Sequence, residues 1–151
     1  MVELALTLAI LGIIAIIAIP NIASWRASFA LRNASQEVFA MLMQAKTEAM
    51  RRNRVVEFNV DTADPARPNM RICVRDCTNP ANPKIKQSML ADGVKLVNGD
   101  GPDCQARLLN NTIDFRANSL PQGGQCGSIY LAVGRQQAYV EISRTGDISI
   151  H

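Results

Sequence analysis

The sequence predicts an α+β fold, in which one long N-terminal helix is followed by a small antiparallel β domain. Residues 4–19 form an uncharged apolar run in which Thr7 is the only polar side chain. A helical repeat of apolar residues then continues to about residue 54. After it come short β-type segments separated by Gly-, Pro- and Asn-rich turns. The apolar run and its edges take up residues 1–24 of the 151-residue chain. The remaining residues, 25–151, are enough for one small domain.

The apolar run has the composition of a helix that crosses a membrane. Residues 1–23 are about long enough to span a hydrocarbon core of roughly 30 Å. Glu3 lies at the start of the run, and an unpaired carboxylate is costly in lipid, so we expect a specific cation to meet it. A signal peptide would show a basic region and a small-residue cleavage site, and this segment shows neither. A plain anchor would usually carry flanking Lys or Arg rather than a lone Glu.

Beyond Pro20 the pattern becomes that of an amphipathic helix, which we expect to pack on the β domain. Arg51, Arg52 and Arg54 lie in its last turn, where cations suit the negative end of the helix dipole. Gly12 and Pro20 are the expected weak points of a rod of roughly 75–80 Å. The predicted apolar face comprises Trp25, Phe29, Ala34, Val38, Leu42, Ala45 and Ala49.

Seven short segments after Arg54 are predicted to be strands, antiparallel because they follow one another closely. Turn formers divide them, among them Asp64-Pro65 and Thr145-Gly146. We expect the strands to pack on the amphipathic half of the helix. They are residues 55–60, 70–74, 94–97, 112–115, 128–133, 137–142 and 147–150.

Four cysteines lie in the β domain. Behind a membrane helix this domain would face an oxidising compartment, where an even number of cysteines indicates disulfides. Four cysteines allow three pairings. We favour Cys73–Cys77, which closes a turn after a strand, and Cys104–Cys126, which ties two loops. A zinc site is disfavoured, because the Cys73/Cys77 pair has no second pair of that kind and no nearby His.

Composition and motifs argue against an enzyme and against a dedicated nucleic-acid binder. The only histidine is His151, and no motif places a nucleophile or carboxylate around it. The sequence has no Gly-rich phosphate loop and no calcium-loop spacing, so we predict no cofactor and no metal. All 16 Lys and Arg follow Trp25, and the net charge beyond it, about +4, is only mildly basic.

The N-terminal residues resemble those of type IV pilins and of the pseudopilins of type II secretion. The matching residues are Met1-Val2-Glu3-Leu4, the apolar run, Gly12 and Ala18-Ile19-Pro20-Asn21-Ile22. Mature pilins usually begin with Phe-Thr before this stretch, and their precursors carry a short basic leader. The numbering therefore describes either a trimmed mature form or a misplaced start. The resemblance implies N-terminal methylation, a pair between Glu3 and the N-terminal amine of a neighbouring subunit, and a helix hinge between Gly12 and Pro20 that opens in the filament.

A narrower resemblance, over nearly the whole chain, is to the GspH/FimT-type minor pilins. It rests on residues 41–53, on the Ile72-Cys73 pair, and on the tail around residues 113–115, 129 and 140–148. Some members bind DNA and usually end in Gly-Arg-x-Arg, where this chain has Gly146-Asp147-Ile148-Ser149. Duplex DNA is disfavoured as a partner, because two phosphate contacts are missing and an acid repels the backbone. The remaining candidate DNA contacts are Arg116, Arg135 and Arg144.

The resemblance implies a structural subunit of a type IV pilus-like filament, and more narrowly a minor pilin. Its partners would be the bacterial inner membrane before assembly, the pilus assembly machinery, and other pilin subunits. The domain would lie in the periplasm and then in an extracellular pilus. Two alternatives are an H-type minor pseudopilin of type II secretion, in a periplasmic pseudopilus, and a DNA-uptake minor pilin. Pseudopilins of this type often lack the cysteines, which favours the pilus.

Overall fold

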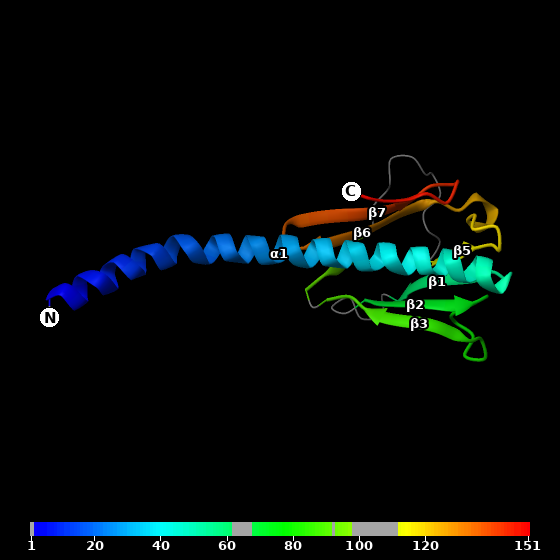
Figure 1. Ribbon diagram of the computed structural model, residues 1–151, viewed down its shortest axis with the longest axis horizontal. Helices are drawn as coiled ribbons and strands as arrows, with labels where there is room; N and C mark the ends of the chain where they lie inside the picture. The colour runs from blue at the N-terminus through cyan, green and yellow to red at the C-terminus, as the bar shows by residue number, and fades with distance from the viewer. Residues whose placement is uncertain (1, 62–67, 92, 98–111) are drawn as a thin grey trace.

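The computed structural model describes residues 2–61, 68–91, 93–97 and 112–151, with the backbone alone at residues 5, 14–21 and 23. One helix, α1 (Val2–Arg52), runs from the first described residue to the edge of the β domain (Figure 1). The predicted α+β fold is confirmed. The described strands are β1 (Val56–Asp61), β2 (Asn69–Val74), β3 (Lys84–Met89), β4 (Lys95–Val97), β5 (Thr112–Phe115), β6 (Gly127–Val133), β7 (Gln136–Ile142) and β8 (Ile148–Ile150), with a short 3-10 turn, η2 (Gln122–Gly124), after β5.

The strands form two antiparallel sheets of four strands each. Their orders are β3-β2-β1-β5 and β4-β6-β7-β8. In the first sheet Phe58 lies opposite both Ile72 and Ile113, so large apolar side chains share one face. The second half of α1 contacts both sheets (Figure 1). One helix face therefore holds the two sheets together.

The core forms where this helix face meets the sheets. Alternate residues of each strand point inward, because side chains of a strand alternate between its two faces. The helix residues recur at spacings of three and four, which places them on one side of the helix. The buried helix residues are Leu31, Ala34, Val38, Met41, Leu42, Ala45 and Ala49, and the large strand residues packed with them include Phe58, Ile72, Ile113, Phe115, Leu131 and Ile142.

The predicted helix face was right over its second part and wrong at its start. Trp25 and Phe29 are 66% and 56% exposed, whereas the predicted face from Ala34 to Ala49 is buried. The reason is the side of the helix that the β domain covers: Leu31, Ala34 and Val38 share that side, whereas Phe29, five residues before Ala34, lies on another. The hairpin between β6 and β7 first touches α1 where Ser28 Oγ donates to Gln136 Oε1 at 3.0 Å. The side chains of Trp25 and Phe29 stack on each other instead, with ring centroids 5.9 Å apart.

All seven predicted strands are present within one or two residues of the predicted bounds, and β3 was not predicted. In β3 Lys84, Lys86 and Gln87 are exposed, and only Ile85 packs against the core. The strand lies at the edge of its sheet, paired with β2 alone. Edge strands are commonly protected by charged side chains, particularly Lys. Because charged and polar residues take most positions of β3, it lacks the alternating apolar pattern from which the other strands were predicted.

The helix ends in a Schellman motif that turns the chain into β1. Asn53 has φ 50°, in the left-handed region, which is favourable for Asn or Gly at this position. The N–H of Arg54 donates to the carbonyl of Ala49 at 3.3 Å, and that of Asn53 donates to the carbonyl of Met50 at 3.3 Å. These bonds satisfy two carbonyls that a helix end otherwise leaves free. The reversal brings Arg54 beside the loop that follows β2.

Candidate functional site

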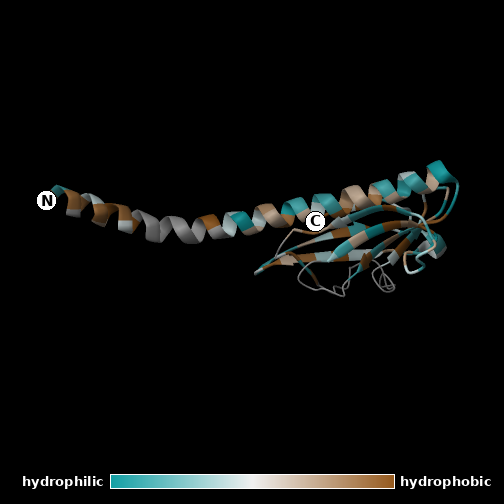
Figure 2. Cartoon of the chain, turned by 90° about the horizontal axis from the view of Figure 1, so that it is seen from below, coloured by the Kyte–Doolittle hydropathy of each residue, from teal (hydrophilic) through white to brown (hydrophobic). Residues whose placement is uncertain are grey.

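The first half of α1 extends beyond the β domain and presents apolar side chains to its surroundings. Val2, Leu4, Leu6, Leu8, Ile10, Leu11 and Ile13 are all exposed. Figure 2 shows hydrophobic colour along this described part, whereas the second half of the helix alternates between hydrophilic and hydrophobic. Exposed apolar area on this scale marks a surface that another molecule covers. Among the described side chains, no helical segment is both long and apolar enough to span a membrane.

Glu3 lies in the first turn of α1 and is exposed. A carboxylate in the first turn interacts favourably with the positive end of the helix dipole. No described residue lies within ion-pair distance of Glu3. Its carboxylate is therefore available to a cation that this part of the chain does not supply.

The predicted hinge residues, Gly12 and Pro20, both lie within the continuous helix. A Cβ added at Gly12 would meet nothing within 4 Å, so no contact in the single chain requires a glycine there. Pro20 is described by its backbone only. The helix curves gently along this half (Figure 1), as long helices do. The opening of the helix in a filament stays a prediction.

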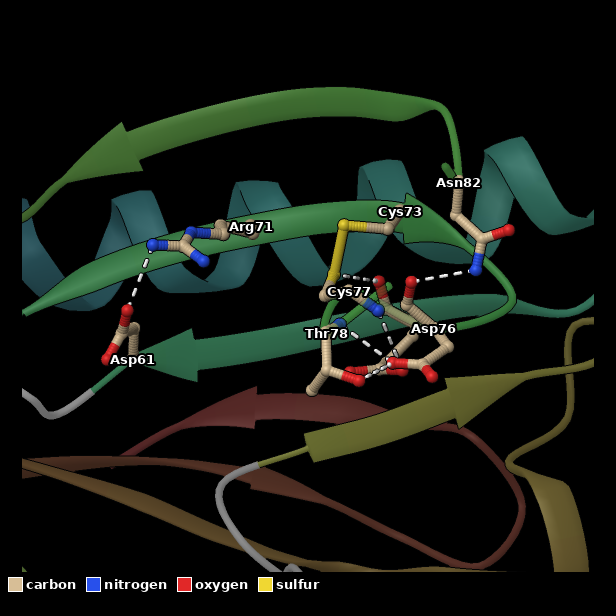
Figure 3. The surroundings of a disulfide bond; sticks show 8 residues. Asp61, Arg71, Cys73, Asp76, Cys77, Thr78 and Asn82 are labelled. Atoms are coloured by element: carbon tan, nitrogen blue, oxygen red, sulfur yellow. Dashed lines mark hydrogen bonds and ion pairs between the residues drawn. A yellow bond between two sulfur atoms is a disulfide. The ribbon is translucent and has the colours of Figure 1, made fainter. Parts of the chain in front are cut away.

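The predicted Cys73–Cys77 disulfide is present at the end of β2 and closes a short loop (Figure 3). Asp76 lies within this loop. Its Oδ1 accepts hydrogen bonds from the N–H of Thr78 at 2.7 Å and from the hydroxyl of Thr78 at 2.6 Å. These bonds lower the pKa of Asp76. The side-chain amide of Asn82 donates to the Asp76 carbonyl at 2.9 Å, which ties the loop to the chain entering β3. The other predicted bond, Cys104–Cys126, involves residue 104, which lies outside the described residues.

Two carboxylates lie beneath the disulfide loop, on neighbouring strands. Glu57 of β1 is 8% exposed and pairs in register with Asp114 of β5. Burial raises the pKa of Glu57, and the N–H of Cys77, which donates to Glu57 Oε2 at 3.2 Å, acts in the opposite direction. Burial also raises the pKa of Asp114, and the nearby charge of Asp76 adds to this. Asp114 Oδ1 is buried and accepts no hydrogen bond from the described residues. Charge on this pair is therefore unfavourable in the folded chain.

The three candidate DNA-contacting arginines lie at two ends of the β domain. Arg135 occupies the β6–β7 turn, next to Gln136, which bonds to Ser28 near the middle of α1. Arg116 follows β5, and Arg144 lies in the β7–β8 turn. That turn is at the far end, because the Lys46 ammonium donates to the Gly146 carbonyl at 2.8 Å. The structure thus separates Arg135 from the other two.

No group of three or more metal-binding side chains occurs within the described ranges. The imidazole of His151 stacks on Tyr139, with ring centroids 4.8 Å apart, and Tyr139 stacks on Tyr130 at 5.1 Å. His151 Nε2 lies 3.6 Å from Glu141 Oε2 and 3.1 Å from Ser149 Oγ. The stacking on Tyr139 and the approach to Glu141 fasten the end of β8 to β7.

Comparison with known proteins gives one family and one fold. A family model described as "Type II transport protein GspH" matches residues 34–146. Two crystal structures of the type IV minor pilin FimU of Pseudomonas aeruginosa (strain PAO1) have TM-scores of 0.60 and 0.62. They are 16% and 17% identical to this chain, cover 80% of it, and are themselves covered over 92% and 87% of their length.

A third solved structure is the minor pseudopilin EpsH from the Type 2 Secretion System of Vibrio cholerae. It has a TM-score of 0.57 and 14% sequence identity, and the match covers 80% of this chain and 95% of EpsH. At these identities the structural matches show a shared fold. No curated protein sequence matched the chain.

Proposed function

This chain belongs to the GspH family of type II transport proteins, within the type IV pilin and pseudopilin superfamily, and we propose that it is a minor pilin of a type IV pilus-like filament. Family members are structural subunits, and we assign no catalytic role. The observation that carries the proposal is the division of α1 into two halves. The second half packs on both sheets, whereas the described apolar side chains of the first half contact none of them.

The first half of α1 is surrounded first by lipid and later by the helices of other subunits. Before assembly, residues 1–24 anchor the chain in the inner membrane, with residues 25–151 on the periplasmic side. During assembly the same apolar side chains pack against the helices of other subunits. A helix bundle is no more apolar than lipid, so the hydrophobic effect cannot drive this transfer. Close packing and polar pairing must decide it.

Glu3 supplies the polar pairing in this account. Its exposed carboxylate has no cationic partner among the described residues, and it stands at the end of α1 that would enter a bundle first. A charge inside an apolar bundle is stable only when a partner neutralises it and bonds to it. The N-terminal amine of a neighbouring subunit would be that partner, which would also fix the axial register between subunits.

Gly12 and Pro20 give α1 a segment that can open after it leaves the membrane. In lipid, unpaired backbone groups are costly, so the helix stays closed there. Pro20 already lacks the donor for the carbonyl of Ile16, so opening forfeits one hydrogen bond fewer. We expect non-helical backbone between Ile13 and Ile19 in the filament. An unbroken helix from Glu3 to Arg51 in a near-atomic filament map would contradict this.

Mass spectrometry of sheared, purified filaments tests the proposal as a whole. We expect this chain at a small fraction of the abundance of the main subunit, with a methylated N-terminus. Its absence from filaments, with the chain held in the membrane fraction, would contradict the proposal. Equal abundance with the main subunit would make it a major pilin instead.

The match to the GspH family and the shared fold with EpsH favour a second candidate, an H-type minor pseudopilin. Deleting the gene distinguishes the two. Loss of surface pili with normal secretion supports the pilus, and loss of secretion with normal pili supports the pseudopilus. For a DNA-uptake role, Arg116→Gln should weaken salt-sensitive binding of duplex DNA to the full chain. Unchanged binding would remove Arg116 from that role.

A further inference from the structure

A pocket of about 400 Å³ lies at the end of the molecule farthest from the N-terminus, where three segments meet. They are the end of α1, the end of β2, and the loop that leads into β3, on the right-hand side of Figure 1. This pocket is separate from the apolar half of α1 and from the proposed assembly role. Its lining residues are Arg52, Arg54, Val74, Arg75, Asn82 and Pro83.

Three of the lining residues are arginines, and none is acidic. Arg52 is paired with Glu48 at 2.7 Å, and Glu48 also accepts from Arg51 at 2.9 Å. These hydrogen bonds lower the pKa of Glu48. Among the described residues, Arg54 and Arg75 have no acidic partner. The pocket is therefore lined by two arginines without an ion-pair partner among the described residues, beside one that is paired.

The nearest acid in the sequence, Asp76, forms no ion pair with Arg75. Its Oδ1 accepts hydrogen bonds from the N–H and the hydroxyl of Thr78 (Figure 3). Asp76 is not part of the pocket lining. The disulfide loop thus keeps its own carboxylate hydrogen-bonded within the loop and leaves the arginine of that loop in the pocket.

The backbone of Arg75 adopts a conformation that side-chain-bearing residues rarely take. Its φ is 74°, in the left-handed region where glycine is favoured. The surrounding structure holds it there. The N–H of Arg75 donates to the Val55 carbonyl at 3.0 Å, and the Cys73–Cys77 disulfide closes the loop behind it. Such a backbone outlier, imposed by its surroundings, points to a function for the residue that occupies it.

We propose that this pocket binds a phosphate group, either as inorganic phosphate or as a phosphate monoester. A guanidinium presents its donors in a planar fork that matches two oxygens of a phosphate, which a Lys ammonium does not. Two unpaired guanidiniums equal the charge of a phosphate dianion. The volume is within the range of small-ligand sites. Arg54 and Arg75 bind the oxygens, and Arg52 adds charge while it stays bonded to Glu48.

Isothermal titration of the full chain in uncharged detergent micelles tests this assignment. The probes are inorganic phosphate and glycerol 3-phosphate, with acetate at the same ionic strength as the control anion. We expect saturable binding of both phosphates and none of acetate. Arg54→Gln and Arg75→Gln should each weaken binding about tenfold or more, because a hydrogen bond to a charged group is lost. Arg135→Gln, at the other end of the β domain, is the matched control and should bind as the natural chain does.

Arg75→Gly separates the ligand role from a structural one. Glycine takes the left-handed conformation without strain, so the variant should melt at a higher temperature than the natural chain while losing phosphate binding. An Arg75→Gly chain that binds phosphate normally would overturn the proposal. So would the absence of saturable phosphate binding. Binding of a 12-bp duplex but of neither small phosphate, weakened equally by Arg135→Gln and Arg54→Gln, would overturn it as well.

Discussion

The two halves of α1 are equally helical, yet they differ in how far their apolar side chains are buried. In the first half the described apolar residues are all exposed, whereas in the second half an apolar stripe is buried to near completion. The difference lies in the pattern. A stripe with helical period can be buried by one partner on one side, while apolar residues on every side need neighbours all round. One half is therefore satisfied within the chain, and the other needs a membrane or a bundle.

The comparison predicts that the same substitution has very different effects in the two halves. Leu42 is fully buried, so Leu42→Ala should destabilise the β domain by about 3 kcal/mol or more, through lost burial and the cavity left behind. Leu8 is 60% exposed, so Leu8→Ala should leave the melting temperature unchanged. Thermal unfolding of both full-length variants in detergent measures this. Equal destabilisation would mean that the first half packs on its own β domain.

The disulfide should stabilise the domain by about 2 kcal/mol, since it closes only a short loop. Replacing both Cys73 and Cys77 by Ser should therefore lower the melting temperature of the β domain while the helical circular dichroism of α1 persists. Reduction of the natural chain should lower it at least as much. An unchanged melting temperature would show that the loop keeps its shape without the bond.

Two glycines, one in each region, give a further contrast. Gly146 has φ 80°, and an added Cβ would lie 3.1 Å from the Ser119 carbonyl oxygen, so Gly146→Ala should cost about 1 kcal/mol or more. Gly12 has open space around it, and Gly12→Ala should leave the β domain as stable as before. Chemical denaturation of the two variants checks this pair. Equal loss of stability in both would contradict the division of α1 into two regions.

The buried carboxylates predict a smaller, pH-dependent effect. Glu57 has a raised pKa, so its contribution to stability is present below the unfolded pKa, about 4, and is lost as the pH rises through its folded pKa. Glu57→Gln keeps an acceptor for the Cys77 N–H and removes the charge. It should match the natural chain near pH 4 and be more stable than the natural chain at pH 7.

The control for this prediction is Asp76, whose pKa is lowered by its bonds to Thr78. Its contribution is present at neutral pH and is lost as the pH falls through its folded pKa. Asp76→Asn should therefore be less stable than the natural chain at pH 7, and the two stabilities should converge in acid. If Glu57→Gln is instead less stable than the natural chain at pH 7, the buried charge is favourable where it lies.

Much of the fold could be predicted from the sequence, because its patterns are local. The seven strands with Val and Ile alternation, the helix end at the arginines and the Cys73–Cys77 bond all follow from neighbouring residues. What could not be predicted depends on distant parts of the chain. Trp25 and Phe29 have core-like spacing, but the sheets cover another side of the helix, the one that carries Leu31 and Val38. Arg75 and Arg54 line one pocket only because β1 and β2 pair and the chain reverses direction at Asn53.

The incorporation of a Glu3→Leu chain into filaments tests the central claim most directly. The full-length variant and the natural chain are expressed in cells that lack the natural copy, and each is quantified in the membrane fraction and in sheared filaments. Glu3→Asp is the matched control that keeps the charge. We predict that Glu3→Leu reaches the membrane in normal amounts and is absent from filaments, while Glu3→Asp retains part of the incorporation. Normal amounts of Glu3→Leu in filaments would contradict the account.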